Sequence, residues 1–397
     1  MVSTTIAATQ KIESDSRRWR LILTDQNGET LDSADGNVIS MNHTIEASSD
    51  TFTIGEIFTQ NINIELRRAI DQDPNITFDY EANTAIRIAY GLRDAPGLIH
   101  MGTFRVKKVE KVRDRIRLNL KDYLINELSD TYTASTFPSY PVPILDVMQD
   151  ICSEYMPINY YEPLYILDDE HEGEYCLAYD NADSVIYVLS DEATDSGGDP
   201  ITLSQTEVQY LSGKKVSEAL SICAGLLGCS LVKGRDNTLE CIRPSRVPIE
   251  ITSSRSAAPD FSGKEQQIVG VICKRSDDIY AEDELKVWRE DSQHQELPGI
   301  YIEYENPLML DDDLFEEVTQ DYLDWFMRPA TINHMLGDPR LDPLDIVGYE
   351  DVYDEMYEES GHFQMPLMSL SYTFDGGLSC TLRATANYSY KKEDNNG

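Results

Sequence analysis

The stretch Met368–Ala384, MSLSYTFDGGLSCTLRA, decides the fold class of this chain. Apolar residues alternate with polar ones on both sides of Asp375-Gly376-Gly377: Leu370, Tyr372 and Phe374 come before, and Leu378, Cys380 and Leu382 follow. Period-two alternation gives a strand one buried and one solvated face, and Asp-Gly is a turn signal. The stretch therefore predicts a β-hairpin. A glycine of its turn should need a positive φ, so we expect Gly377→Val to impair folding.

The same alternation fills the first part of the chain. It recurs in RWRLIL (residues 18–23), NINIEL (61–66), AIRIAY (85–90) and RIRLNLK (115–121). Asn27-Gly28 is a tight-turn signal, and residues 101–123 have the pattern of a long hairpin. One wet and one buried face per strand is typical of antiparallel sandwiches and barrels. We place a β-domain at residues 16–130, behind an N-terminal arm at residues 1–15.

Helical spacing replaces this pattern in residues 131–248. The segment YPVPILDVMQDICSEY carries apolar residues at Ile144, Val147, Met148, Ile151 and Tyr155. This spacing predicts an amphipathic helix that begins near Pro143. The segment GKKVSEALSICAGLLG has the same spacing and ends at Gly228, a natural helix stop, and two short strands, CSLVK and TLECIR, follow it. We predict an α+β domain whose segment 157–212 is acidic, rich in tyrosine and loop-rich.

Strands return in residues 249–392, in QQIVGVICKR, LKVWRE, IYIEYE and the hairpin quoted above. One helix, DDDLFEEVTQDYLDWFMR, interrupts them, with aspartates at its start and Arg328 at its end, as the helix dipole favours. Its predicted apolar face is Leu314, Val318, Tyr322, Trp325 and Phe326. We therefore predict a second β-domain with a helical insertion at about residues 306–335. Two β-domains around a mixed domain suggest an old duplication.

The charge balance argues against a function in nucleic-acid binding. The 397 residues include 33 Lys and Arg against 71 Asp and Glu, a formal net charge of −38. Such a surface repels phosphates and anionic membranes, whereas DNA binding needs clustered basic residues. We expect the excess acidity to line a passage; the simpler alternative is that it serves solubility on the outside.

Cysteines and the N-terminus point to a cytoplasmic site of synthesis. The seven cysteines include no C-x-x-C pair, and Cys152 and Cys223 fall on apolar helical faces, as free thiols in a reducing compartment do. The first residues have no basic segment followed by an apolar run, so they do not resemble a signal peptide. The most apolar stretch, Leu220–Val232, is shorter than the ~20 residues that a membrane span needs.

Sequence motifs for catalysis are absent. The chain has no H-E-x-x-H, Walker A, G-x-G-x-x-G or G-x-S-x-G. The six histidines are scattered without metal-ligand spacing: His43, His100, His171, His294, His334 and His362. We therefore predict no catalytic, cofactor-binding or metal-binding residue. A glycosidase would need a selected pair of carboxylates, and nothing in the sequence selects one.

Two acidic segments offer possible cation ligands. One contains Asp168, Glu170, His171 and Glu174, and the other contains Asp191, Glu192, Asp195 and Asp199. Neither has the glycine-spaced pattern of a calcium loop, so we favour solvated acidic loops.

The stretch GDPRLDPLDIV, residues 337–347, holds three more aspartates. Asp338 and Asp342 each precede a proline, which drives them to extended geometry, and Asp side chains cap turns. Asp345 leads into the predicted strand that begins at Ile346. We interpret the stretch as a corner that returns the chain to the last β-domain.

Six blocks, taken in order, resemble the hub family of phage tails and related contractile injection particles. They are TIGEIFTQNINIEL (53–66), GTFRVKKVEKVRDRIRLNLKDYLINEL (102–128), FPSYPVPILDVMQDICSEY (137–155), KVSEALSICAGLLGCSLVKGRDNTLECI (215–242), GDPRLDPLDIV (337–347) and MSLSYTFDGGLSCTLRA (368–384). The resemblance implies two tail-tube-like β-barrel domains flanking the mixed domain. Three chains then supply six such domains, so a threefold hub meets a sixfold tube.

The resemblance also implies a role and partners. The chain is expected to be a non-enzymatic structural protein of a tail tip or baseplate, located in the virion and assembled in the bacterial cytoplasm. Expected partners are two further copies, the tail tube protein, a central spike or tip, baseplate or fibre proteins and a tape-measure protein, with a channel for DNA. The chain ends at Gly397, so we expect no added cell-wall-degrading domain.

The structural residues that we single out lie in three places. They are Gly102, Phe104 and Val106 in the long hairpin, Leu220 and Leu226 in the central helix, and Gly376-Gly377 in the last turn. The alternative function is a carbohydrate- or receptor-binding tip protein. Its binding platform would be formed by Tyr160, Tyr161, Tyr165, Tyr175 and Tyr179, although these are equally compatible with core and surface tyrosines.

Overall fold

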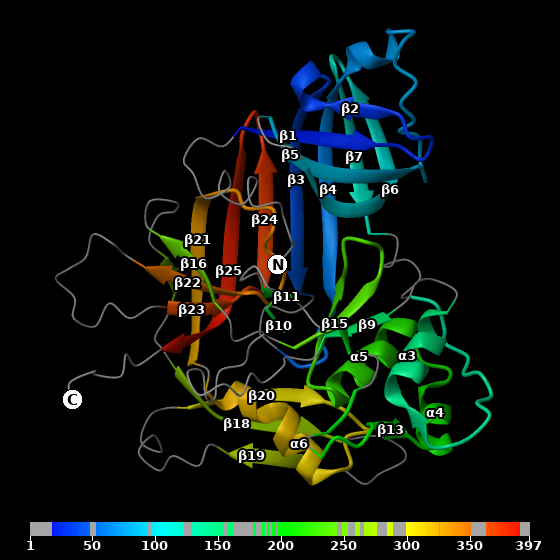
Figure 1. Cartoon of the computed structure of the whole chain (residues 1–397), viewed down its shortest axis with the longest axis vertical. Coiled ribbons are helices and arrows are strands. Elements are labelled where there is room, and N and C mark those ends of the chain that lie inside the picture. Colours follow the sequence, from blue (N-terminus) through cyan, green and yellow to red (C-terminus); the bar gives the residue numbers. More distant parts are fainter. Residues whose placement is uncertain are drawn as a thin grey trace, which may run out of the picture.

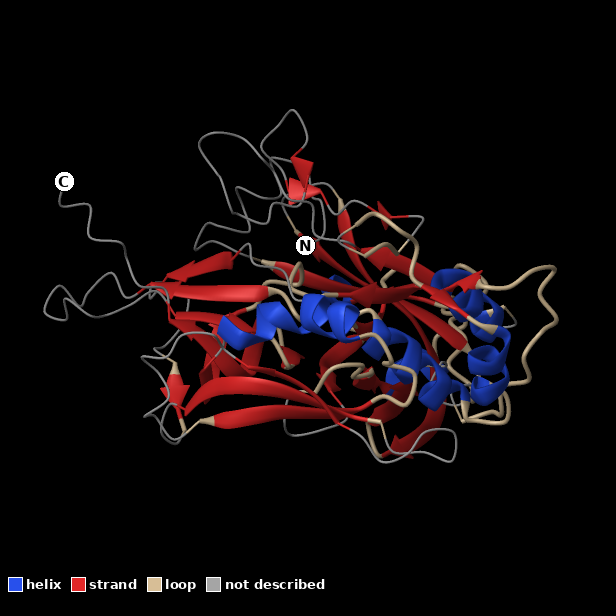
Figure 2. Ribbon diagram, turned by 90° about the horizontal axis from the view of Figure 1, so that it is seen from below, coloured by secondary structure: helices blue, strands red, loops and turns tan. Residues whose placement is uncertain are grey.

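The fold is mainly β with helices gathered in one region. The computed structural model describes residues 18–47, 53–93, 97–122, 129–153, 158–161, 178–179, 185–186, 189–190, 193–195, 197–243, 248–252, 259–262, 266–275, 284–288, 299–324, 326–350 and 363–389. The expected N-terminal arm at residues 1–15 lies outside these ranges. The four described α-helices lie at the lower end of the molecule in Figure 1, and the view from below in Figure 2 places them in front of the strands.

The first β-region contains seven strands. They are β1 (Trp19–Thr24), β2 (Thr30–Asp32), β3 (Val38–Ala47), β4 (Phe58–Arg67), β5 (Ala85–Leu92), β6 (Leu98–Val112) and β7 (Arg115–Lys121). They pair antiparallel in the order β2-β1-β5-β6-β7-β4-β3. The predicted long hairpin is β6–β7. The alternating apolar residues Trp19, Leu21 and Leu23 are buried, as their spacing predicts.

The middle region is the predicted mixture of helices and short strands. Its helices are α3 (Ile144–Cys152), α4 (Gln205–Leu211) and α5 (Val216–Leu226). Its strands are β8 (Val142–Pro143), β9 (Ile158–Tyr161), β10 (Ala178–Tyr179), β11 (Val185–Ile186), β12 (Leu189–Ser190), β13 (Thr202–Leu203), β14 (Ser230–Lys233) and β15 (Leu239–Ile242). Cys152 on α3 and Cys223 on α5 are buried free thiols. Burial raises the pKa of each thiol to about 12, so both behave as small apolar side chains.

The second β-region holds the remaining strands. They are β16 (Pro248–Thr252), β17 (Asp260–Phe261), β18 (Gln266–Lys274), β19 (Glu284–Trp288), β20 (Ile300–Glu305), β21 (Phe326–Leu336), β22 (Ile346–Glu350), β23 (Phe363–Pro366), β24 (Ser369–Phe374) and β25 (Leu378–Ser389). The hairpin that opened the sequence analysis is β24–β25, with Phe374 opposite Leu378. Leu370, Tyr372, Phe374, Leu378, Cys380 and Leu382 are all buried, which confirms the predicted alternation.

The two β-regions are joined into one sheet. Strand β3 pairs antiparallel with β24, from Glu46 opposite Ser369 to Met41 opposite Phe374. Figure 1 shows β21, β25, β24, β3 and β4 standing side by side. No described pairing closes either β-region into a barrel of its own, so the two separate barrels remain a prediction, as do the domain boundaries.

The predicted helical insertion is shorter than expected. Helix α6 (Asp312–Thr319) is capped by Asp311, whose side chain accepts from the N–H groups of Asp313 and Leu314, and a 3₁₀ turn ends at Asp324. From Phe326 the chain forms strand β21. The predicted helical insertion at about residues 306–335 is therefore too long, and the placement of Phe326 on its helical face is wrong. Pro329 disfavours a continuing helix, and β21 instead pairs with β25.

The glycine with positive φ in the last hairpin is Gly376. Its φ is +73°, whereas Gly377 lies outside the left-handed range. The Asp375 N–H donates to the Gly377 carbonyl at 3.0 Å and closes the turn. The predicted need for a positive-φ glycine is confirmed, but its assignment to Gly377 is wrong by one residue.

Among the described helices, none is long and apolar enough to cross a lipid bilayer.

Candidate functional site

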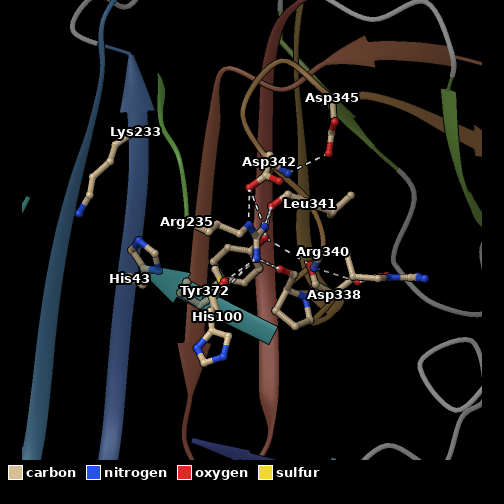
Figure 3. A network of polar contacts seen from close by, with 12 residues as sticks. His43, His100, Lys233, Arg235, Asp338, Arg340, Leu341, Asp342, Asp345 and Tyr372 are labelled. Carbon is tan, nitrogen blue, oxygen red and sulfur yellow. Dashed lines mark hydrogen bonds and ion pairs between the residues drawn. The ribbon is translucent and has the colours of Figure 1, made fainter. Parts of the chain in front are cut away.

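Arg235 lies where all three regions meet. It sits in the turn between β14 and β15, and its side chain is only 15% exposed. The guanidinium donates to an Asp342 carboxylate oxygen at 2.6 and 3.1 Å, to the Pro339 and Leu341 carbonyls at 2.6 and 3.0 Å, and to the His100 carbonyl at 3.3 Å (Figure 3). Burial alone would lower the pKa of Arg235, but Asp342 outweighs it and the pKa lies above its usual value. A middle-region side chain thus binds both β-regions.

The stretch GDPRLDPLDIV forms the corner that its sequence predicts. Two backbone turns close it, from the Leu341 N–H to the Asp338 carbonyl and from the Asp345 N–H to the Asp342 carbonyl. The buried Asp338 and Arg340 form an ion pair at 2.7 Å, and the Asp342 N–H donates to the Asp345 carboxylate at 2.8 Å. The corner leads into β22 at Ile346, and its carboxylates are used within the fold. This supports a structural reading over a metal or catalytic one.

Tyr372 attaches this corner to the joined sheet. It is a fully buried residue of β24, and its hydroxyl donates to the Leu341 carbonyl at 2.9 Å and approaches the Asp338 carbonyl at 3.3 Å. Two carbonyls of the corner therefore depend on a strand that itself pairs with β3. The network of Figure 3 connects the β14–β15 turn, which carries Arg235, to the corner and to the β24 strand that joins the two β-regions.

A second buried cation ties the middle region to β6. Lys233 ends β14, and its ammonium donates to the Thr103 carbonyl at 2.5 Å and lies 3.5 Å from the Asp122 carboxylate. It also lies 4.3 Å from the centre of the Phe104 ring. Burial lowers the pKa of Lys233, while Asp122 opposes that shift. A buried charge with a carboxylate, a carbonyl and a ring around it is a fixed structural contact.

His43 extends this contact into the core of the first β-region. The Gln60 amide nitrogen donates to the Lys233 carbonyl at 3.2 Å, so its oxygen is left to accept from His43 Nε2–H at 2.9 Å. Burial is the main reason why the pKa of His43 is lowered to about 4; the Gln60 hydrogen bond opposes this shift, and the nearby Arg235 and Lys233 contribute to it. The ring is therefore neutral at physiological pH and serves packing and hydrogen bonding. We call Arg235, Lys233, His43 and the corner 338–345 the three-region junction.

The other notable surface is the polar face of the joined sheet. One row across the strands reads Asn119, Asn63, Asn42, Thr373 and Ser379, on β7, β4, β3, β24 and β25. The next row reads Lys121, Asn61, Thr44, Ser371 and Thr381. Side chains bond along these rows, with Asn119 to Asn63 at 3.0 Å and Thr373 to Asn42 at 3.1 Å. The face is therefore an ordered array of amides and hydroxyls.

This face is hollowed, and it is not acidic. Ser40, Asn42, Asn63, Glu65, Lys108, Glu110, Arg117 and Asn119 line a depression of about 570 Å³. The charged residues at outward positions of β3, β4, β6, β7 and β25 include Glu46, Glu65 and Glu110, and Arg67, Lys108, Arg115, Arg117, Lys121 and Arg383. Basic residues outnumber acidic ones among these, so this face is not acidic; the expected acidic lining of a passage stays a prediction.

The residues of the long hairpin and of the central helix that were singled out for structural roles lie in the core, whereas Gly376 and Gly377 lie in an exposed turn. Phe104 and Val106 are fully buried on β6, Leu220 is fully buried on α5, and Leu226 is 3% exposed. Gly102 has a φ of +118°, next to the Phe104 ring. Of these residues, Gly102 and Phe104 lie beside Lys233 of the junction.

The two acidic segments and the tyrosines of the alternative sugar platform lie largely outside the described residues. This applies to Asp168, Glu170, His171, Glu174, Asp191, Glu192, Tyr165 and Tyr175. Tyr160, Tyr161 and Tyr179 lie on short strands whose side chains are not described. Asp195 accepts from the N–H groups of Gly197 and Asp199 at 2.9 Å each, as a turn residue does. In the described part of the chain, no group of three His, Cys, Asp or Glu residues is placed to hold a metal.

Sequence reasoning did not single out Arg235 and Lys233. The available signal was a pair of basic residues at a hairpin tip, in a chain with a net charge of −38. Basic residues are few in such an acidic chain, and these two lie beside the apolar strands of a hairpin. A cation that is buried there needs an anionic partner, which would have marked both residues as candidates for buried ion pairs.

Two solved structures are similar to this chain in fold over nearly their whole length. A tail protein from Neisseria meningitidis MC58 superimposes with a TM-score of 0.52 at 11% identity, covering 93% of this chain and 96% of its own. The 43 kDa tail protein of prophage MuSo2 from Shewanella oneidensis does so with a TM-score of 0.50 at 11% identity, covering 92% and 98%.

This chain has the fold of phage tail proteins. No family model and no curated protein sequence matches it. At such low identity the likeness concerns the fold alone. The phage-tail fold was the expectation that six sequence blocks raised, and it is confirmed.

Proposed function

We propose that the chain is a non-enzymatic structural hub of a phage tail tip or baseplate. Three copies would form a ring that joins a sixfold tail tube to a threefold spike or tip. The observation that carries this proposal is the pairing of β3 with β24. It puts two β-regions side by side in one sheet within one chain, so three chains supply six β-regions in sequence around a ring.

The ring also accounts for the open edges of the sheet. Unpaired strand edges invite further pairing, and closed symmetry satisfies them without open-ended growth. In this ring the hollowed face would be turned toward the axis. The rows of Asn, Ser and Thr would then be the channel wall, through which DNA or a tape-measure protein passes.

Such a wall suits a conduit. Amides and hydroxyls do not trap phosphates, as a lysine- or arginine-rich wall would by releasing counterions. Several basic residues of this face are paired with carboxylates: Arg115 and Arg117 both pair with Glu65, and Lys108 pairs with Glu110. The acidity of the chain would then serve solubility and repulsion on other surfaces.

The three-region junction would keep the ring rigid. Arg235 and Lys233 fix the middle region to both β-regions through buried ion pairs and carbonyl contacts. A hub transmits load between the tube and the tip, so its regions must not rotate independently. Its partners would be the tube protein, the spike or tip, other baseplate or fibre proteins and the tape-measure protein, in a virion assembled in the bacterial cytoplasm.

Sedimentation of the purified protein tests the proposal. The protein is expected to form a trimer, with three times the 45.0 kDa mass of one chain, alone or on mixing with its tube and spike proteins. A monomer mass that persists with both partners present would contradict it. A carbohydrate-binding role is not proposed, because no described side chain supports it.

A further inference from the structure

An aromatic pair stands on the outer face of the strands β19, β18 and β20. Trp288 of β19 and Tyr301 of β20 both lie opposite Gly270 of the central strand β18. The centres of the two rings are 5.4 Å apart, and the ring planes stand at 87° to each other. Trp288 is 54% exposed and Tyr301 is 41% exposed. The two rings therefore form a corner that is open to solvent.

The core beneath these strands does not need Trp288. The inward side chains of the three strands are buried, and the ring of Tyr304 packs against Phe315 of α6 at 6.3 Å. On the outer face, an added Cβ at Gly270 would lie 3.3 Å from Cδ1 of Tyr301, so the glycine lets that ring cover the strand. This explains the position of Tyr301, whereas Trp288 leaves more than half of its surface in solvent.

Charged residues flank the aromatic pair on the same face. The next two rows across the strands are Lys286, Ile272 and Glu303, and then Glu284, Lys274 and Glu305. Lys286 pairs with Glu284 at 2.7 Å, and Lys274 pairs with Glu303 at 2.5 Å. Glu305 adds a further carboxylate, so carboxylates outnumber ammonium groups on this face of a chain whose net charge is −38. The face thus combines exposed aromatic rings with an excess of negative charge.

This combination fits a guanidinium group. The face of an aromatic ring attracts cations, and the carboxylates around it attract them at longer range. A guanidinium is planar and weakly hydrated, so it stacks on a ring and still donates two parallel hydrogen bonds to a carboxylate. An ammonium group has neither the flat surface nor the paired donors. Two rings at right angles offer a guanidinium two contacts at once.

The strand that carries Tyr301 also leads to a cavity. Glu305, at the end of β20, lines a cavity of about 770 Å³ together with residues of α5 and of the segment 53–59. From Tyr301 to Glu305 the distance along an extended strand is about 13 Å. A protein segment that places one arginine at the aromatic corner therefore reaches the cavity with its next few residues. This continuity points to an extended protein segment as the occupant.

We propose that the outer face of β19, β18 and β20 docks an arginine-bearing segment of a partner protein. One guanidinium sits in the corner of Trp288 and Tyr301 and binds the Glu303 carboxylate in place of Lys274. The exchange costs little, because Lys274 and Glu303 form an exposed ion pair, with side chains 40% and 51% exposed. The inference goes beyond the proposed function and does not depend on the number of copies in the hub.

The test is calorimetric titration of the full chain with a short capped peptide of glycines and two arginines. Matched peptides replace both arginines by lysine or by citrulline, which has the shape of arginine without its charge. At physiological salt the arginine peptide should bind, and the lysine peptide should bind about fivefold more weakly. The citrulline peptide should not bind measurably.

Variants of the aromatic corner show where the peptide binds. Trp288→Ala should weaken binding of the arginine peptide about tenfold, and Trp288→Phe should recover part of that loss, since phenylalanine keeps a ring. Leu336→Ala is the matched control, because Leu336 is also exposed, at 39%, but lies on β21. It should bind like wild type.

Two further readings use the carboxylate and the emission of the ring. Glu303→Gln should weaken binding about threefold, whereas Glu110→Gln, which removes the same charge on β6, should leave it unchanged. The chain has three tryptophans, of which Trp19 is buried. The peptide should change the tryptophan emission of wild type but not that of Trp288→Phe.

The outcomes separate the inference from the proposed function. Weaker binding by Trp288→Ala with unchanged binding by Leu336→Ala supports the inference. It is overturned if the arginine peptide does not bind, if both variants bind it equally, or if the lysine peptide binds as tightly. A trimer that dissociates in Trp288→Ala would make this face a contact between copies, which also overturns it. A protein that stays monomeric with tube and spike proteins, yet binds the peptide through Trp288, contradicts the hub and leaves the inference standing.

Discussion

At the residue scale, Gly376 bears the backbone strain of the last hairpin. Its φ is +73°, whereas Gly377 is outside the left-handed range, and an added Cβ at either residue would meet no atom within 4 Å. The two glycines therefore differ in backbone conformation, whereas both have room for a side chain. Gly376→Ala should lower the free energy of unfolding by about 1 kcal/mol. Gly377→Ala is the matched control and should leave it nearly unchanged in urea unfolding; equal losses would contradict the turn geometry.

His43 gives stability a pH dependence of known sign. Its pKa is about 4 in the folded protein against a usual 6.5, chiefly because it is buried. The unfolded chain takes up a proton below pH 6.5 and the folded chain does not, so stability is complete above pH 6.5. It is lost as pH falls from 6.5 to 4, by up to about 3 kcal/mol. Wild type should therefore lose stability relative to His43→Gln over this window; a constant difference would contradict a buried neutral ring.

Glu240 is the control of opposite sign. Burial raises its pKa to about 8 from a usual 4.5, so the folded chain keeps a proton that the unfolded chain releases. Its contribution is present below pH 4.5 and is lost as pH rises to 8. Wild type should lose stability relative to Glu240→Gln between pH 5 and 8, measured by the same urea unfolding series.

The sequence could predict which residues are buried but not which polar ones meet. The alternation around Tyr372 fixes its inward face by a local rule. Which of Gly376 and Gly377 takes the positive φ depends on the turn type, and the sequence Asp-Gly-Gly is compatible with more than one type. Arg235 and Asp342 are 107 residues apart, so no local pattern connects them. The corner at Asp338 was predictable because Asp-Pro geometry is local.

At the element scale, Gly228 lets the end of α5 pack against α6. Its carbonyl accepts from the Tyr322 hydroxyl at 2.7 Å, and an added Cβ would lie 2.7 Å from the Val318 carbonyl oxygen. Gly228→Ala should therefore destabilise by roughly 2–3 kcal/mol, from backbone strain plus the clash. Gly213 also has a positive φ but open space, so Gly213→Ala should cost about 1 kcal/mol. Equal melting temperatures would contradict this packing.

The three-region junction should be worth more than a surface ion pair. Arg235→Met leaves the Asp342 carboxylate and the Pro339 carbonyl without the donor that Arg235 provides, at a cost of roughly 2–3 kcal/mol. Arg117→Met is the control, because Arg117 also pairs with a carboxylate but is 55% exposed, so it should cost less than about 1 kcal/mol. Limited proteolysis should also cut the Arg235 variant faster. Equal losses in the two variants would mean that the junction does not couple the regions.

The length of α6 shows where helical periodicity misleads. Leu314, Val318 and Tyr322 have helical spacing, and the pattern continues through Trp325 and Phe326. The helical region nevertheless ends at Asp324, because the next residues find a long partner in β25. Tertiary pairing overrides a local preference when it buries a whole strand.

At the scale of the whole molecule, the decisive feature is the joined sheet. Thr44 and Ser371, which meet across the β3–β24 join, are 327 residues apart. The order of β, mixed and β segments could be predicted from periodicity. The join could not, because nothing local marks β3 as the neighbour of β24. The sequence likewise could not place the acidic residues: the rows of the sheet face carry amides and hydroxyls, and the expected acidic passage stays a prediction.

Imaging of the purified protein tests the central claim most directly. Class averages viewed down the particle axis, at the concentrations of tail assembly and with tube protein added, should show a threefold ring. We predict six similar β-lobes around an open centre, two from each chain. A monomer, a twofold particle or a ring without an open axis would contradict the account.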